Sequence, residues 1–264
     1  MATKYVIVCQ ARTGSTMLAT ALQAHKDICA HGEVFGMRDS HLNFWGIIYE
    51  KDPPLIESMR RFRNENPVQY LRDFVLNPGR FKSVGFKFKF EELSQEAWKD
   101  VVADVAADRS LKILFLRREN LWQRFLSEFV AVHVTKMFNT TDKSYEQPET
   151  SIEIDPAKVE KAFQRSRRWE RIYGAMFARH DRLDLSYEAI SKDYDGVMRE
   201  VQDFLGVPQA NLKPATVKLT DRRTTVIKNL DAIREHFAGT EFAEFFEEIK
   251  TAPAPASART RSRK

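Results

Sequence analysis

The sequence has few cysteines and no long apolar run. Its two cysteines, Cys9 and Cys29, both lie among apolar neighbours, so no disulfide framework is expected. No apolar stretch approaches the roughly 20 residues that span a bilayer, and the amino terminus leads directly into a predicted strand rather than a signal peptide. We therefore expect a cytoplasmic protein without a transmembrane segment.

Strong charge of one sign is also absent from most of the chain. The formal net charge of the 264 residues is +5, and most of it comes from 252–264, a segment with four cationic side chains and no acidic one. This segment is rich in Pro, Ala and Ser, so it predicts a disordered basic tail behind a single domain that covers 1–251. Because that domain is nearly neutral, we expect no nucleic-acid partner.

The most informative stretch is 5–25, where an apolar strand, a polar loop and an amphipathic helix follow one another. The run Tyr5–Cys9 is typical of a parallel strand that is buried on both faces. The loop supplies a cation, one glycine for a tight turn and two hydroxyls, and then opens into a helix. Because the unpaired amides at the start of a helix bind phosphate, this stretch predicts a phosphate site. Its expected ligands are Arg12, Thr13, Gly14, Ser15, Thr16 and Met17.

Three familiar phosphate loops do not fit this stretch. A Walker A loop requires GxxxxGK[ST], but no lysine follows Gly14 and the upstream glycine is missing. A dinucleotide fingerprint requires GxGxxG, and only one glycine is present. A phosphatase loop places Arg six positions after Cys, where this chain has Ser15 after Cys9. In a further alternative no phosphate binds, and Ser15 and Thr16 merely cap the helix.

A second phosphate signal follows the predicted strand 111–116. Arg117 and Arg118 come directly after this strand, and Ser127 lies on the next predicted helix. The planar fork of an arginine suits phosphate oxygens, and the helix start adds its dipole. Alternatively, both arginines are solvated charges and Ser127 is a small packing residue. Two such phosphate sites at the ends of two parallel strands would suit a ligand with two separate phosphate groups. We call residues 12–17 the first cradle, and Arg117 or Arg118 with Ser127 the second.

Together the two signals resemble the sulfotransferases that use 3′-phosphoadenosine 5′-phosphosulfate (PAPS). In the shared loop pattern, a strand is followed by five positions and then a helix: Arg or Lys; Thr or Ser; Gly; Ser or Thr; and Thr. Residues 12–16 of this chain match these five positions. Arg at the first of them is typical of the bacterial carbohydrate and glycolipid branch of the family. In that family an Arg at the end of a later strand and a Ser on the following helix hold the 3′-phosphate. These positions match Arg118 and Ser127, although the choice between Arg117 and Arg118 stays open.

The same resemblance assigns roles beyond the two cradles. A basic loop that folds over the 3′-phosphate end of the nucleotide matches Arg222 or Arg223 by position. An acidic residue after the second strand, which takes the proton from the acceptor hydroxyl, matches Glu33. His31 lies in the same turn, and whether it assists Glu33 stays open. Alternatively, Glu33 forms a salt bridge and His31 satisfies backbone groups.

Two segments could bind the acceptor. The stretch 38–76 is aromatic and interrupted by prolines, and its Phe44, Trp45 and Tyr49 either stack on an acceptor or belong to the core. The stretch 139–155 is polar and lacks periodicity, as is typical of a lid or an acceptor loop.

Periodicity predicts the remaining elements that position the site. A short second strand is expected at 27–30, and strand 83–90 alternates with Lys87 and Lys89 on one face. Either one of these lysines points into the ligand crevice or the face is solvated. A continuous amphipathic helix is expected at 93–107.

We therefore predict an α/β protein of the three-layer P-loop type, with a central, mostly parallel sheet flanked by helices. The resemblance implies in-line transfer of a sulfuryl group from PAPS to a hydroxyl of a sugar, glycolipid or small metabolite, with Glu33 as general base and Arg12 offsetting charge on the departing 5′-phosphate. No Asp or His cluster has metal-ligand spacing, so no obligatory metal is expected. The alternatives are a P-loop kinase-like nucleotide enzyme and a nucleotide-binding module without catalysis. The sequence leaves the oligomeric state open.

Overall fold

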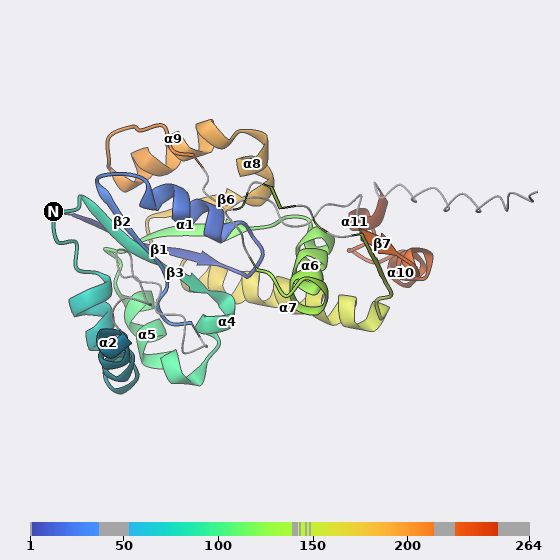
Figure 1. The fold of residues 1–264 in the computed structure, drawn as a ribbon, viewed down its shortest axis with the longest axis horizontal. Helices are drawn as coiled ribbons and strands as arrows, with labels where there is room; N and C mark the ends of the chain where they lie inside the picture. The colour runs from blue at the N-terminus through green and yellow to red at the C-terminus, as the bar shows by residue number, and fades with distance from the viewer. Residues whose placement is uncertain are drawn as a thin grey trace, which may run out of the picture.

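Five parallel strands form the centre of the protein, in the spatial order β2-β3-β1-β4-β6 (Figure 1). The computed structural model describes residues 2–36, 53–138, 142, 144, 145, 147, 149–213 and 225–247. The strands of the sheet are β1 (Thr3–Cys9), β2 (Ile28–Glu33), β3 (Ser83–Lys89), β4 (Lys112–Arg117) and β6 (Arg182–Ser186). β1 pairs with β3 on one side and β4 on the other, and its residues 5–9 have no exposed surface. The apolar run at the start of the chain is thus the central strand that the sequence predicts.

Helices cover both faces of this sheet. Val6 and Val8 of β1 pack into one core cluster with side chains of α5 and α7, while Ile7 and Cys9 pack into another with α1 and α9. Alternate side chains of a strand point to opposite faces, so the protein has three layers (Figure 1). The predicted three-layer α/β fold is therefore confirmed. The helices are α1 (Ser15–Gln23), α2 (Pro53–Glu65), α3 (Pro67–Tyr70), α4 (Phe90–Leu93), α5 (Lys99–Ala107), α6 (Leu121–Phe129), α7 (Pro156–Met176), α8 (Tyr187–Lys192), α9 (Tyr194–Leu205), α10 (Leu230–Phe237) and α11 (Glu244–Glu247).

A smaller layer holds α6 in place beyond the edge of the sheet. The short strands β5 (Thr150–Ile152) and β7 (Thr225–Ile227) pair in parallel next to α10 and α11 (Figure 1). A third core cluster joins Trp122 and Phe125 of α6 to Phe163 of α7 and to Phe237 of α10. Since α6 is fixed on this apolar face, its opposite face is presented to the loop after β1.

Two predicted elements have different bounds in the structure. The expected continuous helix 93–107 is divided into α4, a 3₁₀ turn at Glu96–Trp98 and α5. This break lets the buried Trp98 ring pack edge-on against Phe35, with ring centroids 5.3 Å apart. The second strand runs on to Glu33 instead of ending at residue 30. None of the helices in the described ranges combines the length and apolar character needed to cross a bilayer.

Candidate functional site

The loop between β1 and α1 follows a sharply turned path. Gly14 has a φ of 87°, and Arg12 also has a left-handed backbone, with a φ of 68°. Thr13 Oγ1 donates a hydrogen bond of 2.7 Å to the carbonyl of Gln10, which closes the turn. A Cβ atom at position 14 would lie 2.7 Å from Cδ2 of Tyr187, so both conformation and space require glycine there.

This turn presents the amino end of α1 at the edge of the sheet. α1 starts at Ser15, and its N-cap residue, Gly14, has no side chain with which to cap the helix. The first amides of a helix, here including those of Ser15, Thr16 and Met17, have no partner within the helix. The predicted ligands of the first cradle therefore share one loop and one helix start. The hydroxyl of Thr13, however, is used inside the loop, so that residue has only its amide to offer.

The second predicted cradle lies directly against the first. The Arg118 guanidinium donates to the backbone carbonyl of Arg12 at 3.2 Å, and Arg12 Nε donates to Ser127 Oγ at 3.1 Å. Arg12 Nη1 also donates to the carbonyl of Phe138. The guanidinium carbon of Arg118 lies 4.4 Å from the centre of the Tyr187 ring, so the two side chains form a cation–π contact. Arg12, Arg118 and Ser127 thus form one corner.

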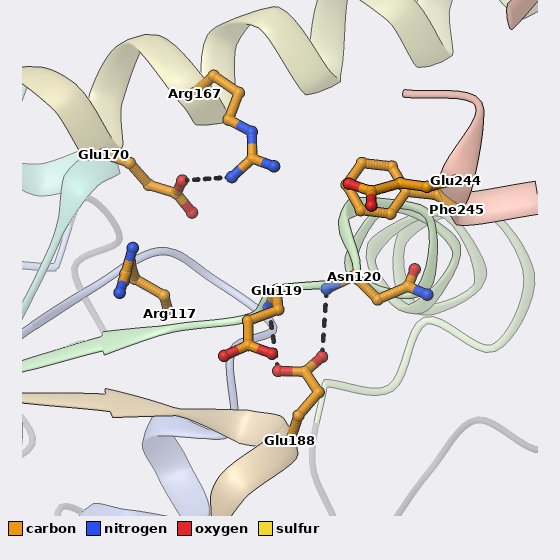
Figure 2. A pocket seen from close by; sticks show the side chains of 8 residues that line it. All are labelled: Arg117, Glu119, Asn120, Arg167, Glu170, Glu188, Glu244 and Phe245. Carbon is orange, nitrogen blue, oxygen red and sulfur yellow. Dashed lines mark hydrogen bonds and ion pairs between the residues drawn. The ribbon is translucent and has the colours of Figure 1, made fainter. Parts of the chain in front are cut away.

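The residues after Tyr187 shape the same corner from the neighbouring strand. Glu188 accepts hydrogen bonds from the backbone amides of Glu119 and Asn120, at 3.0 and 3.2 Å, just before α6 (Figure 2). Asn120 then caps α6 by accepting from the amide of Gln123 at 2.9 Å. The start of α6, and with it Ser127, is thereby fixed to the end of β6.

Arg117 and Arg118 have different surroundings. Arg117 is exposed and lines a cavity of about 390 Å³ together with Arg167, Glu170 and Glu188 (Figure 2). Arg118 is partly buried and contacts the loop after β1. Neighbouring residues at the end of a strand point to opposite sides, which explains the difference. The geometry therefore associates Arg118, rather than Arg117, with Ser127.

The structure adds an arginine that the sequence analysis did not single out. Arg124 of α6 is 1% exposed, and its Nη1 donates to Glu128 at 2.8 Å and to the carbonyl of Ala11 at 3.4 Å. Arg124 lies one helical turn before Ser127, on the face of α6 that meets the loop. No local pattern marks Arg124, because its neighbours at helical spacing, Asn120 and Ser127, are polar.

Glu33 lies beside two lysines at the carboxyl end of β3. Its carboxylate is 2.8 Å from Lys87 Nζ and 2.7 Å from Lys89 Nζ. Although burial acts to raise the pKa of Glu33, the two lysines outweigh it and lower the pKa to about 2. The register of β2 on β3 shifts between Ala30 and Glu33, and this irregularity brings Glu33 opposite Lys87. Lys87 and Lys89 therefore pair with Glu33 and do not form a solvated face, while the prediction that one of them points into a ligand crevice stays a prediction.

Lys87 connects this acid to the start of α1. Its side chain is 5% exposed, and its Nζ donates to Thr16 Oγ1 at 3.2 Å as well as pairing with Glu33. One buried ammonium group thus links the candidate general base to the first turn of α1.

His31 points into the protein interior. It is 3% exposed, and its Nε2 lies 3.4 Å from the sulfur of Cys29. Burial lowers the pKa of His31 to about 4, in spite of an opposing hydrogen bond to the backbone of Val75. This environment matches the alternative in which His31 satisfies backbone groups.

Several predicted site residues fall outside the described residues. These are Arg222 and Arg223 and the aromatic residues Phe44, Trp45 and Tyr49. Within the described ranges, no group of three or more His, Cys, Asp or Glu side chains is placed to hold a metal ion.

Comparisons with known proteins extend over most of the chain. No protein-family model matches it. Nodulation protein H of Rhizobium tropici is 24% identical over 256 residues, which cover 95% of this chain and 95% of the relative. The crystal structure of a sulfotransferase from Alicyclobacillus acidocaldarius is 19% identical, covers 90% of this chain and 92% of its own, and has a TM-score of 0.44. Mouse sulfotransferase SULT7A1 complexed with PAP is 14% identical, with coverage of 79% and 60% and a TM-score of 0.42.

The predicted site residues come together at the edge of the sheet. The glycine loop opens into an uncapped helix, and the arginine and serine after the neighbouring strand meet that loop. The chain is therefore an α/β protein whose two predicted cradles meet at one edge of its parallel sheet.

Proposed function

We propose that the protein transfers a sulfuryl group from PAPS to the hydroxyl of an acceptor, such as a sugar, a glycolipid or a small metabolite. The observation that carries this proposal is the hydrogen bond between Arg12 and Ser127, which joins the two phosphate cradles at one edge of the sheet. A nucleotide with both a 3′- and a 5′-phosphate is a ligand that such a double cradle fits.

The residues at this corner suit a doubly phosphorylated nucleotide. Arg118 Nε and two nitrogens of Arg124 are buried and make no hydrogen bond within the described ranges. Buried donors without acceptors are costly, and phosphate oxygens would satisfy them. In the proposal, Ser127 and Arg118 hold the 3′-phosphate, while the amides from Thr13 to Met17 and the hydroxyls of Ser15 and Thr16 hold the 5′-phosphate.

The proposed reaction is an in-line displacement at sulfur. The acceptor oxygen forms a bond to sulfur while the bond from sulfur to the 5′-phosphate oxygen breaks. The hydroxyl proton passes to Glu33, and the electron pair of the broken bond stays on the 5′-phosphate, where Arg12 and the α1 amides offset the new charge. Lys87, which contacts both Glu33 and Thr16, would lie between the proton acceptor and the leaving phosphate.

Glu33 must become more basic during this reaction. With a pKa of about 2 it is ionised but accepts a proton poorly at neutral pH. We propose that the negative charge of the bound sulfuryl donor draws Lys87 away from Glu33. Loss of that ion pair would raise the pKa of Glu33 when the substrates are in place.

A nucleotide-binding comparison tests the proposal first. Isothermal titration should give tighter binding of adenosine 3′,5′-bisphosphate than of ATP with Mg²⁺; the reverse order, with magnesium-dependent ATP turnover, would support a kinase-like enzyme instead. A screen of hydroxyl acceptors with radiolabelled PAPS then tests catalysis. Nucleotide binding without transfer to any acceptor class would favour a binding module.

A further inference from the structure

Arg124 carries a buried positive charge that the protein only partly satisfies. Its side chain is 1% exposed, and its Nε and Nη2 atoms make no hydrogen bond within the described ranges. Among the described residues, the partners of Arg124 are bound through Nη1: the Glu128 carboxylate at 2.8 Å and the Ala11 carbonyl at 3.4 Å. A guanidinium has five N–H donors in a planar fork, so most of its donors lack an acceptor.

Two further arginines increase the cost of this charge. Burial lowers the pKa of Arg12 and of Arg118, and repulsion from Arg124 adds to the lowering in both. Glu128, the carboxylate paired with Arg124, is partly exposed. Buried cations held close together are tolerated when they are paired or bind an anion. The three arginines therefore have the character of an anion site.

The position of Arg124 indicates which anion it would contact. Arg124 and Ser127 are three residues apart on α6, so they lie on the same face. Ser127 accepts the hydrogen bond from Arg12, and Arg124 reaches the carbonyl of the residue before Arg12. Arg124 thus lies on the Ser127 side of the loop.

We propose that Arg124 is a further phosphate-binding residue, which donates directly to the same phosphate as Ser127. This inference depends on the proposed function, in which that group is the 3′-phosphate of the nucleotide. The competing explanation is structural: Arg124 would merely tie α6 to the loop through Ala11.

The two explanations differ in their effect on truncated nucleotides. Titration calorimetry on the full-length protein would measure affinities for adenosine 3′,5′-bisphosphate and, by competition, for adenosine 5′-monophosphate. If Arg124 binds the 3′-phosphate, Arg124→Gln lowers the affinity for the bisphosphate about ten- to a hundredfold, as loss of a charged hydrogen-bond partner does. Affinity for the 5′-monophosphate changes by less than about threefold.

Matched variants separate this effect from damage to the fold. Arg171→Gln removes an exposed arginine from α7 and should leave both affinities unchanged. Arg124→Lys keeps the charge but loses the fork, and is expected to lie between wild type and Arg124→Gln for the bisphosphate. Both nucleotides bind only folded molecules, so a smaller folded fraction lowers both apparent affinities equally. The ratio of the two affinities therefore remains valid for a destabilised variant.

Each result distinguishes the inference from the function on which it depends. If the wild type binds the bisphosphate and both Arg124 variants keep its affinity ratio, Arg124 is structural and the inference fails alone. Equal losses for the two nucleotides would likewise show that Arg124 has only a structural role. If the wild type does not bind the bisphosphate, the proposed function fails and the inference fails with it.

Discussion

Arg12 Nε and Ser127 Oγ are 3.1 Å apart, although 115 positions separate the two residues along the chain. The contact follows from the sheet. β1 and β4 are neighbours, with Cys9 opposite Leu116, so the loop after β1 and the helix after β4 leave the sheet at the same edge. Arg118 strengthens the connection by donating to the Arg12 carbonyl. Arg12, a residue of the first cradle, therefore contacts both residues of the second, Arg118 through its backbone carbonyl and Ser127 through its side chain.

Arg12→Ala should reduce transfer by about a hundredfold or more, because a donor aimed at charge that develops in the transition state is removed. The measurement is kcat with PAPS at a saturating concentration of an acceptor found by the screen. Arg165→Ala, which removes an exposed arginine of α7, is the control and should retain full activity. A kcat for Arg12→Ala equal to that of wild type would contradict the role of Arg12.

Tyr187 should matter through its ring and not through its hydroxyl. The ring lies under the Arg118 guanidinium and fills the space beside Gly14. Tyr187→Ala is expected to weaken binding of adenosine 3′,5′-bisphosphate by about five- to thirtyfold, the range of a partly desolvated cation–π contact. Tyr187→Phe keeps the ring and should bind within about threefold of wild type. Equal losses in the two variants would show that the hydroxyl is the important group.

The sequence was sufficient to locate the central strand, the glycine loop and the strand before Arg118. These features are local: an apolar run, a glycine and a cation placed directly after a strand. That the two cradles lie at the same edge of the sheet follows from the assumption that the strands are parallel. The direct contact between Arg12 and Ser127 could not be predicted, because it also depends on which strands are neighbours in the sheet.

Other parts of the site depend on tertiary contacts that have no local signal. Arg124 resembles an ordinary helix residue until α6 is docked against the loop. The link from Glu33 through Lys87 to Thr16 requires the irregular pairing of β2 with β3, and no periodic pattern encodes such a shift. The choice between Arg117 and Arg118 likewise depends on which way the end of β4 faces.

Glu92 should make the protein less stable as the pH rises. Burial raises the pKa of its carboxyl to about 7, although Lys89 opposes the shift. The folded state then holds a proton that the unfolded state has lost between about pH 4.5 and 7, so the free energy of unfolding falls across this interval. Glu92→Gln can still accept from the Lys89 amide, and it should stabilise the protein at pH 8 by about 1 kcal/mol.

Urea unfolding of Glu92→Gln and wild type at pH 5 and pH 8 checks this expectation. The matched control is Glu96→Gln, which removes an exposed carboxylate paired with Lys99 and should leave the free energy of unfolding nearly unchanged at either pH. A Glu92→Gln protein that is less stable than wild type at pH 8 would show that the charged Glu92–Lys89 pair is net stabilising.

Glu33→Gln should lower kcat by about a hundred- to ten-thousandfold while leaving the affinity for adenosine 3′,5′-bisphosphate nearly unchanged, because the proposed base contacts the acceptor and not the nucleotide. Loss of bisphosphate binding in this variant would place Glu33 in the nucleotide site instead. An unchanged kcat would exclude Glu33 as the base.

The ion pair of Glu33 with Lys87 should determine the acidic limit of the reaction. A carboxylate whose pKa is lowered to about 2 stays ionised in the free enzyme across the accessible acidic range, so kcat/KM should show no protonation of this group above pH 4. In Lys87→Met, Glu33 keeps the burial that raises its pKa but loses one of the two lysines that lower it. The pKa of Glu33 should therefore rise, and an acidic limb of the pH profile should enter the measurable range. The absolute value of kcat/KM should also fall in Lys87→Met, because Lys87 contacts Thr16. The informative quantity is therefore the pH at which the acidic limb lies. Lys99→Met, which removes a surface lysine, should retain the wild-type profile. Identical pH profiles for Lys87→Met and wild type would mean that a group other than Glu33 takes the proton.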